Sequence, residues 1–226
     1  MPGDRRPLAS RSWPVMARAA GALARAGVSP NAISVAGMVF GAACGGALAA
    51  TGLVGSGQVD SITPGQRVLF ACAAACAQLR LLCNLLDGMV AVEGGRASAV
   101  GELYNELPDR VSDTAALIGA GYALTGVPEA GFVAALFAVL TAYVRAVGKG
   151  AGRGSDFAGV MSKPRRMAVL TGACCAVALL PGPWTGAAHV GGCGFMGVVT
   201  WIVAAGSAAT CLGRTRRLAR RLRGSV

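Results

Sequence analysis

Six long apolar segments dominate the sequence and leave few folds open to it. Separated by short polar stretches, they lie at about residues 32–54, 66–86, 109–125, 129–148, 165–181 and 191–213. The chain of 226 residues is 54% hydrophobic and only 14% charged, which is too little charge to cover a soluble domain of this length. Several segments are shorter than the roughly 20 residues that span a bilayer, so we expect their helices to continue into flanking polar sequence. The expected fold is an all-α integral membrane bundle of six transmembrane helices.

The first 30 residues differ from the rest because arginines alternate there with large apolar side chains. This pattern predicts an amphipathic juxtamembrane helix on the inner membrane surface. A Ser-Pro-Asn sequence at 29–31 follows, and Pro30 suits the start of a helix because its missing N–H costs nothing there. We therefore expect a juxtamembrane segment (1–30), a six-helix membrane domain (31–213) and a basic tail (214–226).

The formal net charge of +11 arises from Arg and Lys residues that flank the apolar segments. No nucleic-acid-binding motif accompanies them, so we expect no nucleic-acid partner. The N-terminus, the 149–166 loop and the C-terminal tail are strongly basic, whereas the 182–194 loop carries no charged residue. Six spans place every basic loop on one side. The positive-inside rule then predicts a multi-pass protein of the cytoplasmic membrane with both termini in the cytoplasm.

Glycine spacing predicts how the first apolar segment packs. Gly37, Gly41 and Gly45 recur there every four residues. Small residues at this spacing let two helix backbones approach closely within a membrane. We expect a packing face at these positions rather than a chemical site.

A polar series interrupts the apolar pattern between the second and third segments. Asn84 and Asp87 share one helix face because they lie three positions apart. On the next helix a series recurs every four residues, at Gly101, Asn105, Asp109 and Asp113. As an alternative, these residues form a wet loop between two helices, but acids at membrane depth usually face a cavity and mark function. Their carboxylate and amide oxygens suit Mg²⁺ or Mn²⁺.

The series resembles the motif of the CDP-alcohol phosphotransferases, Asp-x2-Asp-Gly-x2-Ala-Arg-x8-Gly-x3-Asp-x3-Asp. The positions that match at the required spacing are Asp87, Gly88, Ala91, Gly101 and Asp109. Gly95 and Ser98 also stand where many members carry Gly and Ser, and the Ser-Pro-Asn sequence is similar to the start of the family's first helix. The chain departs from the motif at three positions, with Asn84 and Asn105 at two of the four acidic positions and Val92 at the Arg.

The resemblance implies transfer of a phosphatidyl group from a CDP-linked lipid, such as CDP-diacylglycerol, to an alcohol, with release of CMP in phospholipid synthesis. It implies that Asp109 accepts the proton of the alcohol. Independently of the motif, we expect Asp113 to be an auxiliary acid that partly restores the negative charge lost at Asn84 and Asn105. The resemblance also implies one or two Mg²⁺ or Mn²⁺ ions on Asn84, Asp87, Asn105 and Asp109. The residues expected to bind CDP are Asn31, Gly88, Ala91, Arg96, Ser98 and Gly101. The resemblance and the small-residue faces together favour a homodimer.

Further basic residues follow the fourth apolar segment and precede the fifth. Arg145, Lys149 and Arg153 have near-helical spacing, and Arg145 lies deeper than a membrane anchor needs. Such a cluster suits a phosphorylated acceptor, for example a polyol phosphate. We interpret Lys163, Arg165 and Arg166 mainly as positive-inside anchors. Arg80, one turn before Asn84, is expected to pair with Asp87 or Asp113 inside the bundle.

Two other functions stay open from the sequence. The asparagines at motif positions and Val92 fit a catalytically degenerate relative that acts as a membrane scaffold or regulator. A small-solute transporter would also place polar residues within the membrane. The acids, however, cluster at one membrane face, and no charged residue marks a route through the midplane. This distribution disfavours transport.

Overall fold

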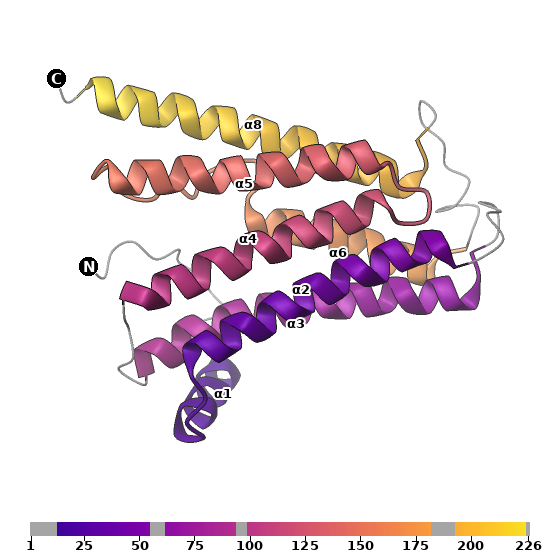
Figure 1. Ribbon diagram of the computed structural model, residues 1–226, viewed down its shortest axis with the longest axis horizontal. Coiled ribbons are helices and arrows are strands. Elements are labelled where there is room, and N and C mark those ends of the chain that lie inside the picture. The colour runs from indigo at the N-terminus through magenta and orange to yellow at the C-terminus, as the bar shows by residue number, and fades with distance from the viewer. Residues whose placement is uncertain (1–12, 55–61, 94–98, 182–192, 225–226) are drawn as a thin grey trace.

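The computed structural model describes residues 13–54, 62–93, 99–181 and 193–224, and all regular structure within these ranges is helical. Figure 1 shows long helices that lie side by side, with the short α1 beside them. In chain order the helices are α1 (Pro14–Arg25), α2 (Pro30–Leu53), α3 (Pro64–Glu93), α4 (Ala99–Gly121), α5 (Pro128–Gly150), α6 (Lys163–Leu179) and α8 (Phe195–Arg223).

Each of the six apolar segments lies largely within one long helix, and these helices extend into polar sequence as predicted. Four of them, α2, α3, α5 and α8, are long and apolar enough to cross a membrane. Many of their large apolar side chains are exposed, including Val39, Val68, Leu136 and Ile202. A protein in water rarely presents so much apolar surface, whereas lipid accommodates it. The chain is a multi-pass membrane protein.

The predicted glycine face of α2 is a packing face. A Cβ at Gly41 would lie 2.4 Å from Ser112 Cβ, and a Cβ at Gly45 would lie 2.2 Å from the Ala115 carbonyl oxygen. Both neighbours belong to α4, so the two backbones approach more closely than any larger residue permits. Gly37 faces Cys83 of α3 instead, with a Cβ–Cβ distance of 3.1 Å. The glycines therefore hold α2 against both helices that carry the polar series.

Helix α1 packs against the end of α3 that follows the polar series. Ala20 and Leu23 of α1 belong to a small apolar cluster with Leu86 and Val90 of α3, while Trp13 at the start of α1 stays exposed. Residues 14–25 of the predicted juxtamembrane segment form a helix, and residues 1–12 lie outside the described part. The placement of this helix on the inner membrane surface stays a prediction.

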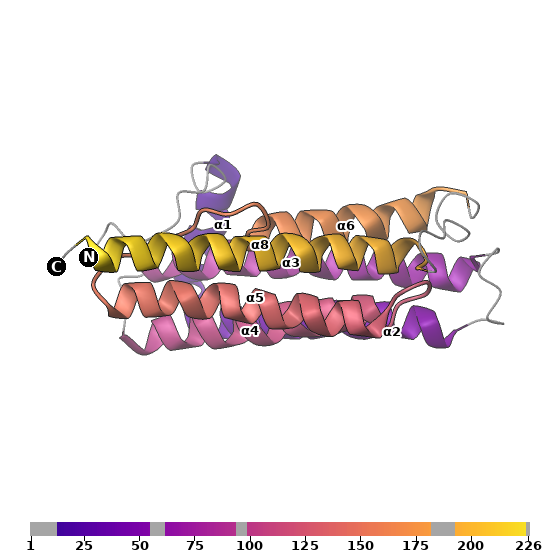
Figure 2. The same ribbon diagram turned by 90° about the horizontal axis from the view of Figure 1, so that it is seen from above.

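The basic regions gather at one end of the bundle. Figure 1 shows the end of α3, the start of α4 and the ends of α5 and α8 at the same side, opposite the turn that joins α4 to α5. Figure 2 shows α5 and α8 running beside each other toward that end. Helix α8 continues to Arg223, so the predicted boundary at residue 213 lies inside a helix. Arginines in its last turn are stabilised by the negative end of the helix dipole.

Candidate active site

Helices α3 and α4 bring three of the predicted site residues together. The Asn84 Nδ2 donates a hydrogen bond of 2.9 Å to Asp109 Oδ1. One turn before Asn84, the Arg80 Nη2 lies 3.3 Å from the same Asp109 oxygen. Asp87, one turn after Asn84, lines the same pocket. The three-residue spacing on α3 therefore directs one face at α4, as the sequence predicts.

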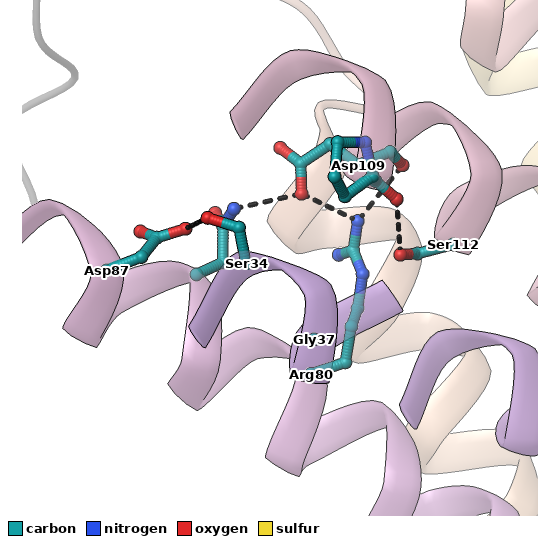
Figure 3. A pocket seen from close by; sticks show the side chains of 8 residues that line it. Ser34, Gly37, Arg80, Asp87, Asp109 and Ser112 are labelled. Atoms are coloured by element: carbon teal, nitrogen blue, oxygen red, sulfur yellow. Dashed lines mark hydrogen bonds and ion pairs between the residues drawn. The ribbon is translucent and has the colours of Figure 1, made fainter. Parts of the chain in front are cut away.

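These residues line a pocket among α2, α3 and α4 (Figure 3). It encloses about 190 Å³, part of it open to solvent. The lining residues are Ser34, Gly37, Arg80, Asn84, Asp87, Pro108, Asp109 and Ser112. Gly37 contributes no side chain, and Pro108 offers no N–H inside α4. Polar groups of three helices thus meet at one accessible point.

Asp87 is 3% exposed and is held by neutral donors. The Ser34 hydroxyl of α2 donates to Asp87 Oδ2 at 2.7 Å, and the Gly88 amide donates to the other oxygen. Within the described ranges no Lys or Arg forms an ion pair with Asp87. Its negative charge is therefore left for a ligand in the pocket.

Asp109 is surrounded by cations. Besides Arg80 on Oδ1, its Oδ2 forms an ion pair with Lys163, the first residue of α6. Arg110 Nη2 lies 3.7 Å from the same oxygen. Asp109 Oδ1 thus accepts from Arg80 and Asn84, while Oδ2 lies within ion-pair distance of Lys163 and Arg110. The two carboxylates of the pocket thus differ in their partners, because Asp109 has cations beside it and Asp87 has only neutral donors among the described residues.

Asp113 lies outside the pocket. It is 1% exposed and forms ion pairs with Arg80 and with Arg166, whose Nη2 is 3.1 Å from Asp113 Oδ2. Of the two partners predicted for Arg80, Asp113 is the observed one and Asp87 is not. These two arginine pairs, together with the pair between Lys163 and Asp109, join α3, α4 and α6 beside the pocket. This burial suits a structural acid more than the auxiliary acid that we expected from the sequence.

One divalent ion fits the donor set. Asp87 offers a carboxylate, and Asn84 beside it has an amide oxygen, a weaker ligand because it is neutral. Across the described residues no three His, Cys, Asp or Glu side chains converge on one point. Mg²⁺ commonly binds through one or two carboxylates and completes its shell with water and substrate phosphate oxygens. The Asp87 side meets this description, whereas the donors around Asp109 compete with a second ion.

A second pocket of about 240 Å³ lies between α5 and α8 at the same end of the bundle. Its charged lining comes from Arg145, Arg214, Arg221 and Asp156. Burial alone would raise the pKa of Asp156, but hydrogen bonds from Arg217 and the Ala158 amide hold it below the ordinary value. The three arginines therefore face one carboxylate, and the pocket is net cationic.

Arg145 connects the two pockets. It forms an ion pair with Glu106 of α4, and its guanidinium lies 5.4 Å from the centre of the Phe157 ring. Glu106 also pairs with Arg110, which follows Asp109. The sequence prediction that Arg145 lies deeper than an anchor agrees with these contacts. Lys149 follows one turn later on α5, and Arg153 lies beyond the helix end.

The remaining predicted residues that the structure describes lie on the helices that form the first pocket but are not among its lining residues. Asn31 lies in the first turn of α2, Gly88 and Ala91 lie on α3 after Asp87, and Gly101 lies near the start of α4. The predictions for Arg96, Ser98 and the Asn105 side chain fall outside the described residues.

Ser34, Lys163 and Arg214 were missed from the sequence. Ser34 lies about one helical turn after the Ser-Pro-Asn sequence, on the same face of α2 as Pro30. This position is the only sequence feature that could have indicated its role. Lys163 belongs to a basic group that membrane anchoring explains equally well. Arg214 was assigned to the tail, yet it is 6% exposed and donates to the carbonyls of Thr141 and Ala158.

Comparison with known proteins gives a match at the level of structure. No protein-family model matches the chain, and no curated protein matches its sequence. The crystal structure of Mycobacterium tuberculosis phosphatidylinositol phosphate synthase (PgsA1) with CDP-DAG bound has a TM-score of 0.67 and 21% identity, covering 90% of this chain and 93% of that chain. The same synthase with manganese and citrate also gives 0.67 and 21%, covering 90% and 88%. The apo form gives 0.63 and 21%, covering 88% and 93%. The chain has the fold of this synthase over about nine tenths of its length.

Proposed function

We propose that this protein transfers a phosphatidyl group from a CDP-linked lipid such as CDP-diacylglycerol to an alcohol and releases CMP. The observation that carries the proposal is the convergence of Asp87, Asn84 and Asp109 on one pocket. This pocket lies in a bundle whose fold is similar to that of a synthase solved with CDP-DAG. The spacing of the three residues also fits the motif that the sequence resembles.

In the proposed reaction the acceptor hydroxyl oxygen bonds to the lipid-side phosphorus, and the bond from that phosphorus to CMP breaks. CMP leaves with the electron pair, and Asp109 accepts the hydroxyl proton. A divalent ion held by Asp87 and Asn84 would supply positive charge for the diphosphate oxygens. Gly88, Ala91 and Gly101 leave space for the nucleotide near the pocket, and Asn31, Arg96 and Ser98 are the further candidates for binding it.

The second pocket is the proposed site of the acceptor's phosphate, if the acceptor carries one. Its arginines offer planar donors that suit phosphate oxygens. Arg145 is the link, because it lines this pocket and contacts Glu106 one turn before Asp109 and Arg110. Lys149 and Arg153 would add positive charge at the entrance. A polyol phosphate is therefore the acceptor class that the charges favour.

We further propose that all six long helices cross the membrane and that the site faces the cytoplasm. The charges of α4 lie between Glu102 and Asp113, so the part of the helix after Asp113 carries no charge. Helix α6 has 17 residues, about 25 Å at 1.5 Å per residue, which is close to the hydrocarbon thickness. The water-soluble CDP head would meet the basic end while the acyl chains stay in lipid. A homodimer is also proposed, on the resemblance to the family, because the glycine face of α2 is occupied within the chain.

The test is CMP release by the purified protein in nanodiscs with CDP-diacylglycerol, Mg²⁺ or Mn²⁺ and a panel of alcohols and polyol phosphates. We expect turnover with at least one acceptor and none in excess EDTA. Glu129→Ala serves as the control, because Glu129 is exposed at the opposite end of the bundle. Unchanged turnover in EDTA, or equal turnover by Asp87→Ala and wild type, would contradict the proposal.

A second candidate function is a membrane scaffold or regulator without turnover. Asn84 directs its amide nitrogen at Asp109, and Lys163 neutralises the same carboxylate, so the site has fewer free acids than the motif provides. Under this reading the wild type binds neither metal nor CDP-lipid, while Asn84→Asp with Asn105→Asp gains both. Metal titration of the two proteins separates the readings.

A further inference from the structure

Two ion pairs join the first turn of α6 to α4 beside the pocket. Lys163 contacts Asp109, and Arg166 contacts Asp113. The two cations lie three positions apart on α6, and the two carboxylates lie four positions apart on α4. Because both spacings correspond to about one helical turn, the two pairs lie on facing sides of the helices. The position of the Lys163 ammonium is thus set by the register of two helices and by a second, buried ion pair.

Lys163 stands where a helix disfavours a cation. It is the first residue of α6, and the first turn of that helix contains no acid. The N-terminus is the positive end of the helix dipole, so a lysine there raises the free energy of the helix. Contact with Asp109 offsets that cost. The ammonium nitrogen is buried at this point, unlike the exposed Arg165 two residues later.

The two sides of the pocket therefore have opposite charge. Asp109 and Asp113 carry two negative charges, and their partners Arg80, Lys163, Arg166 and Arg110 carry four positive ones. Arg110 also pairs with Glu106. A divalent ion placed beside Asp109 would meet an ammonium group and add to a surplus of positive charge. Asp87 accepts hydrogen bonds only from neutral donors in the described structure, and no Lys or Arg there forms an ion pair with it.

We propose that Lys163 is a tethered cation that takes the place of one divalent ion at Asp109, so that the site binds a single Mg²⁺ or Mn²⁺ on the Asp87 side. The inference rests on the proposed function, for which Asp87 and Asn84 hold the ion. It also accounts for the departures from the motif. Asn84 and Asn105 remove two negative charges relative to four aspartates, and two charges are the charge of one divalent ion.

The test counts Mn²⁺ bound per chain in the full-length protein in nanodiscs, without CDP-lipid, from the electron paramagnetic resonance signal of free Mn²⁺. We expect one ion for the wild type, one for Asp109→Asn and none for Asp87→Asn. Lys163→Met should bind two ions, because Asp109 Oδ2 then loses its ammonium partner and keeps only Arg110 at 3.7 Å. Lys163→Met combined with Asp109→Asn should return to one.

Matched variants separate the role of Lys163 from a general loss of charge. Lys163→Arg keeps the cation and should bind one ion. Arg165→Met removes one positive charge from the same turn and should also bind one. If Lys163→Met does not elute as a single species, Lys163→Gln takes its place with the same expectation, and the comparison of Asp87→Asn with Asp109→Asn needs neither variant.

Two ions or none in the wild type overturn the inference, and so does a single ion in a folded Lys163→Met protein. Loss of the ion in Asp109→Asn but not in Asp87→Asn also overturns it. CMP release is measured in parallel. A wild type that binds one ion and releases no CMP contradicts the proposed function alone, whereas a wild type that binds two and turns over contradicts only the tethered cation.

Discussion

Asp87 and Asp113 are both buried acids near the same pocket, but their surroundings differ. Asp87 is 3% exposed, lines the pocket and accepts hydrogen bonds from Ser34 and Gly88. Asp113 is 1% exposed, lies outside the pocket and pairs with Arg80 and Arg166. Burial alone therefore does not identify a functional acid. A buried carboxylate without a cation beside open space can bind a ligand, whereas one between two arginines stabilises the fold.

The largest effect is expected at Asp87. Asp87→Ala should lower CMP release by at least about 10³-fold, because loss of the metal-binding carboxylate removes several kcal/mol of charge stabilisation. Thermal stability should change less than in Asp113→Ala, since Asp87→Ala removes two hydrogen bonds from neutral donors and no ion pair in the described structure. The measurements are CMP release and the thermal unfolding midpoint in detergent, with Glu129→Ala as control. A strongly destabilised Asp87→Ala protein would remove the contrast with Asp113.

Asp113→Ala should affect stability instead. It leaves Arg80 and Arg166 buried without their shared partner, and breaking a buried ion pair in this way costs about 3–5 kcal/mol. Denaturant unfolding of the purified protein measures the change. If Asp113→Ala unfolds like the wild type but loses turnover, Asp113 belongs with Asp87 and the expected auxiliary role is restored.

The glycine face beside Asp113 offers a milder test of the structural side. A Cβ at Gly41 would lie 2.4 Å from Ser112 Cβ, next to Asp113, whereas a Cβ at Gly46 would meet nothing within 4 Å. Gly41→Ala should therefore destabilise the protein by about 1–3 kcal/mol through overpacking. Gly46→Ala should be neutral or slightly stabilising, because alanine favours a helix. Equal stability of the two variants would show that α2 and α4 have room to separate.

The smallest effect is expected in the second pocket. Arg145→Ala should raise the KM for a phosphorylated acceptor about tenfold with a smaller change in kcat, because binding of the acceptor is weakened. Arg216→Ala is the matched control, since Arg216 is exposed on α8 and lines neither pocket. A fall in kcat at unchanged KM would instead assign Arg145 to the Asp109 side through Glu106.

The helices could be predicted closely because apolar runs of membrane length leave few alternatives. The ends were less certain. Helix α8 continues through the basic tail to Arg223, since arginines favour a helix and suit its C-terminus. Proline marks the start of α2, α3 and α5, but proline also occurs in loops, so it does not by itself define a helix start.

The site was predictable only where its residues lie near one another in sequence. Asn84, Asp87 and Asp109 follow from their spacing on two consecutive helices. Ser34 and Lys163 lie 53 and 54 residues from their partners, Asp87 and Asp109. Their contacts depend on how α2 and α6 rotate against the bundle, and tertiary packing sets that rotation. Spacing likewise left two partners for Arg80, and only the packing of α3 on α4 decides between them.

The most direct test of the central claim is a structure of the full-length protein with CDP-diacylglycerol and Mn²⁺, with Mn²⁺ located by anomalous scattering. The account predicts one anomalous peak beside Asp87, the diphosphate next to it, and Lys163 still paired with Asp109. Diphosphate density away from Asp87, or no anomalous peak in this pocket, would contradict the assignment of the site.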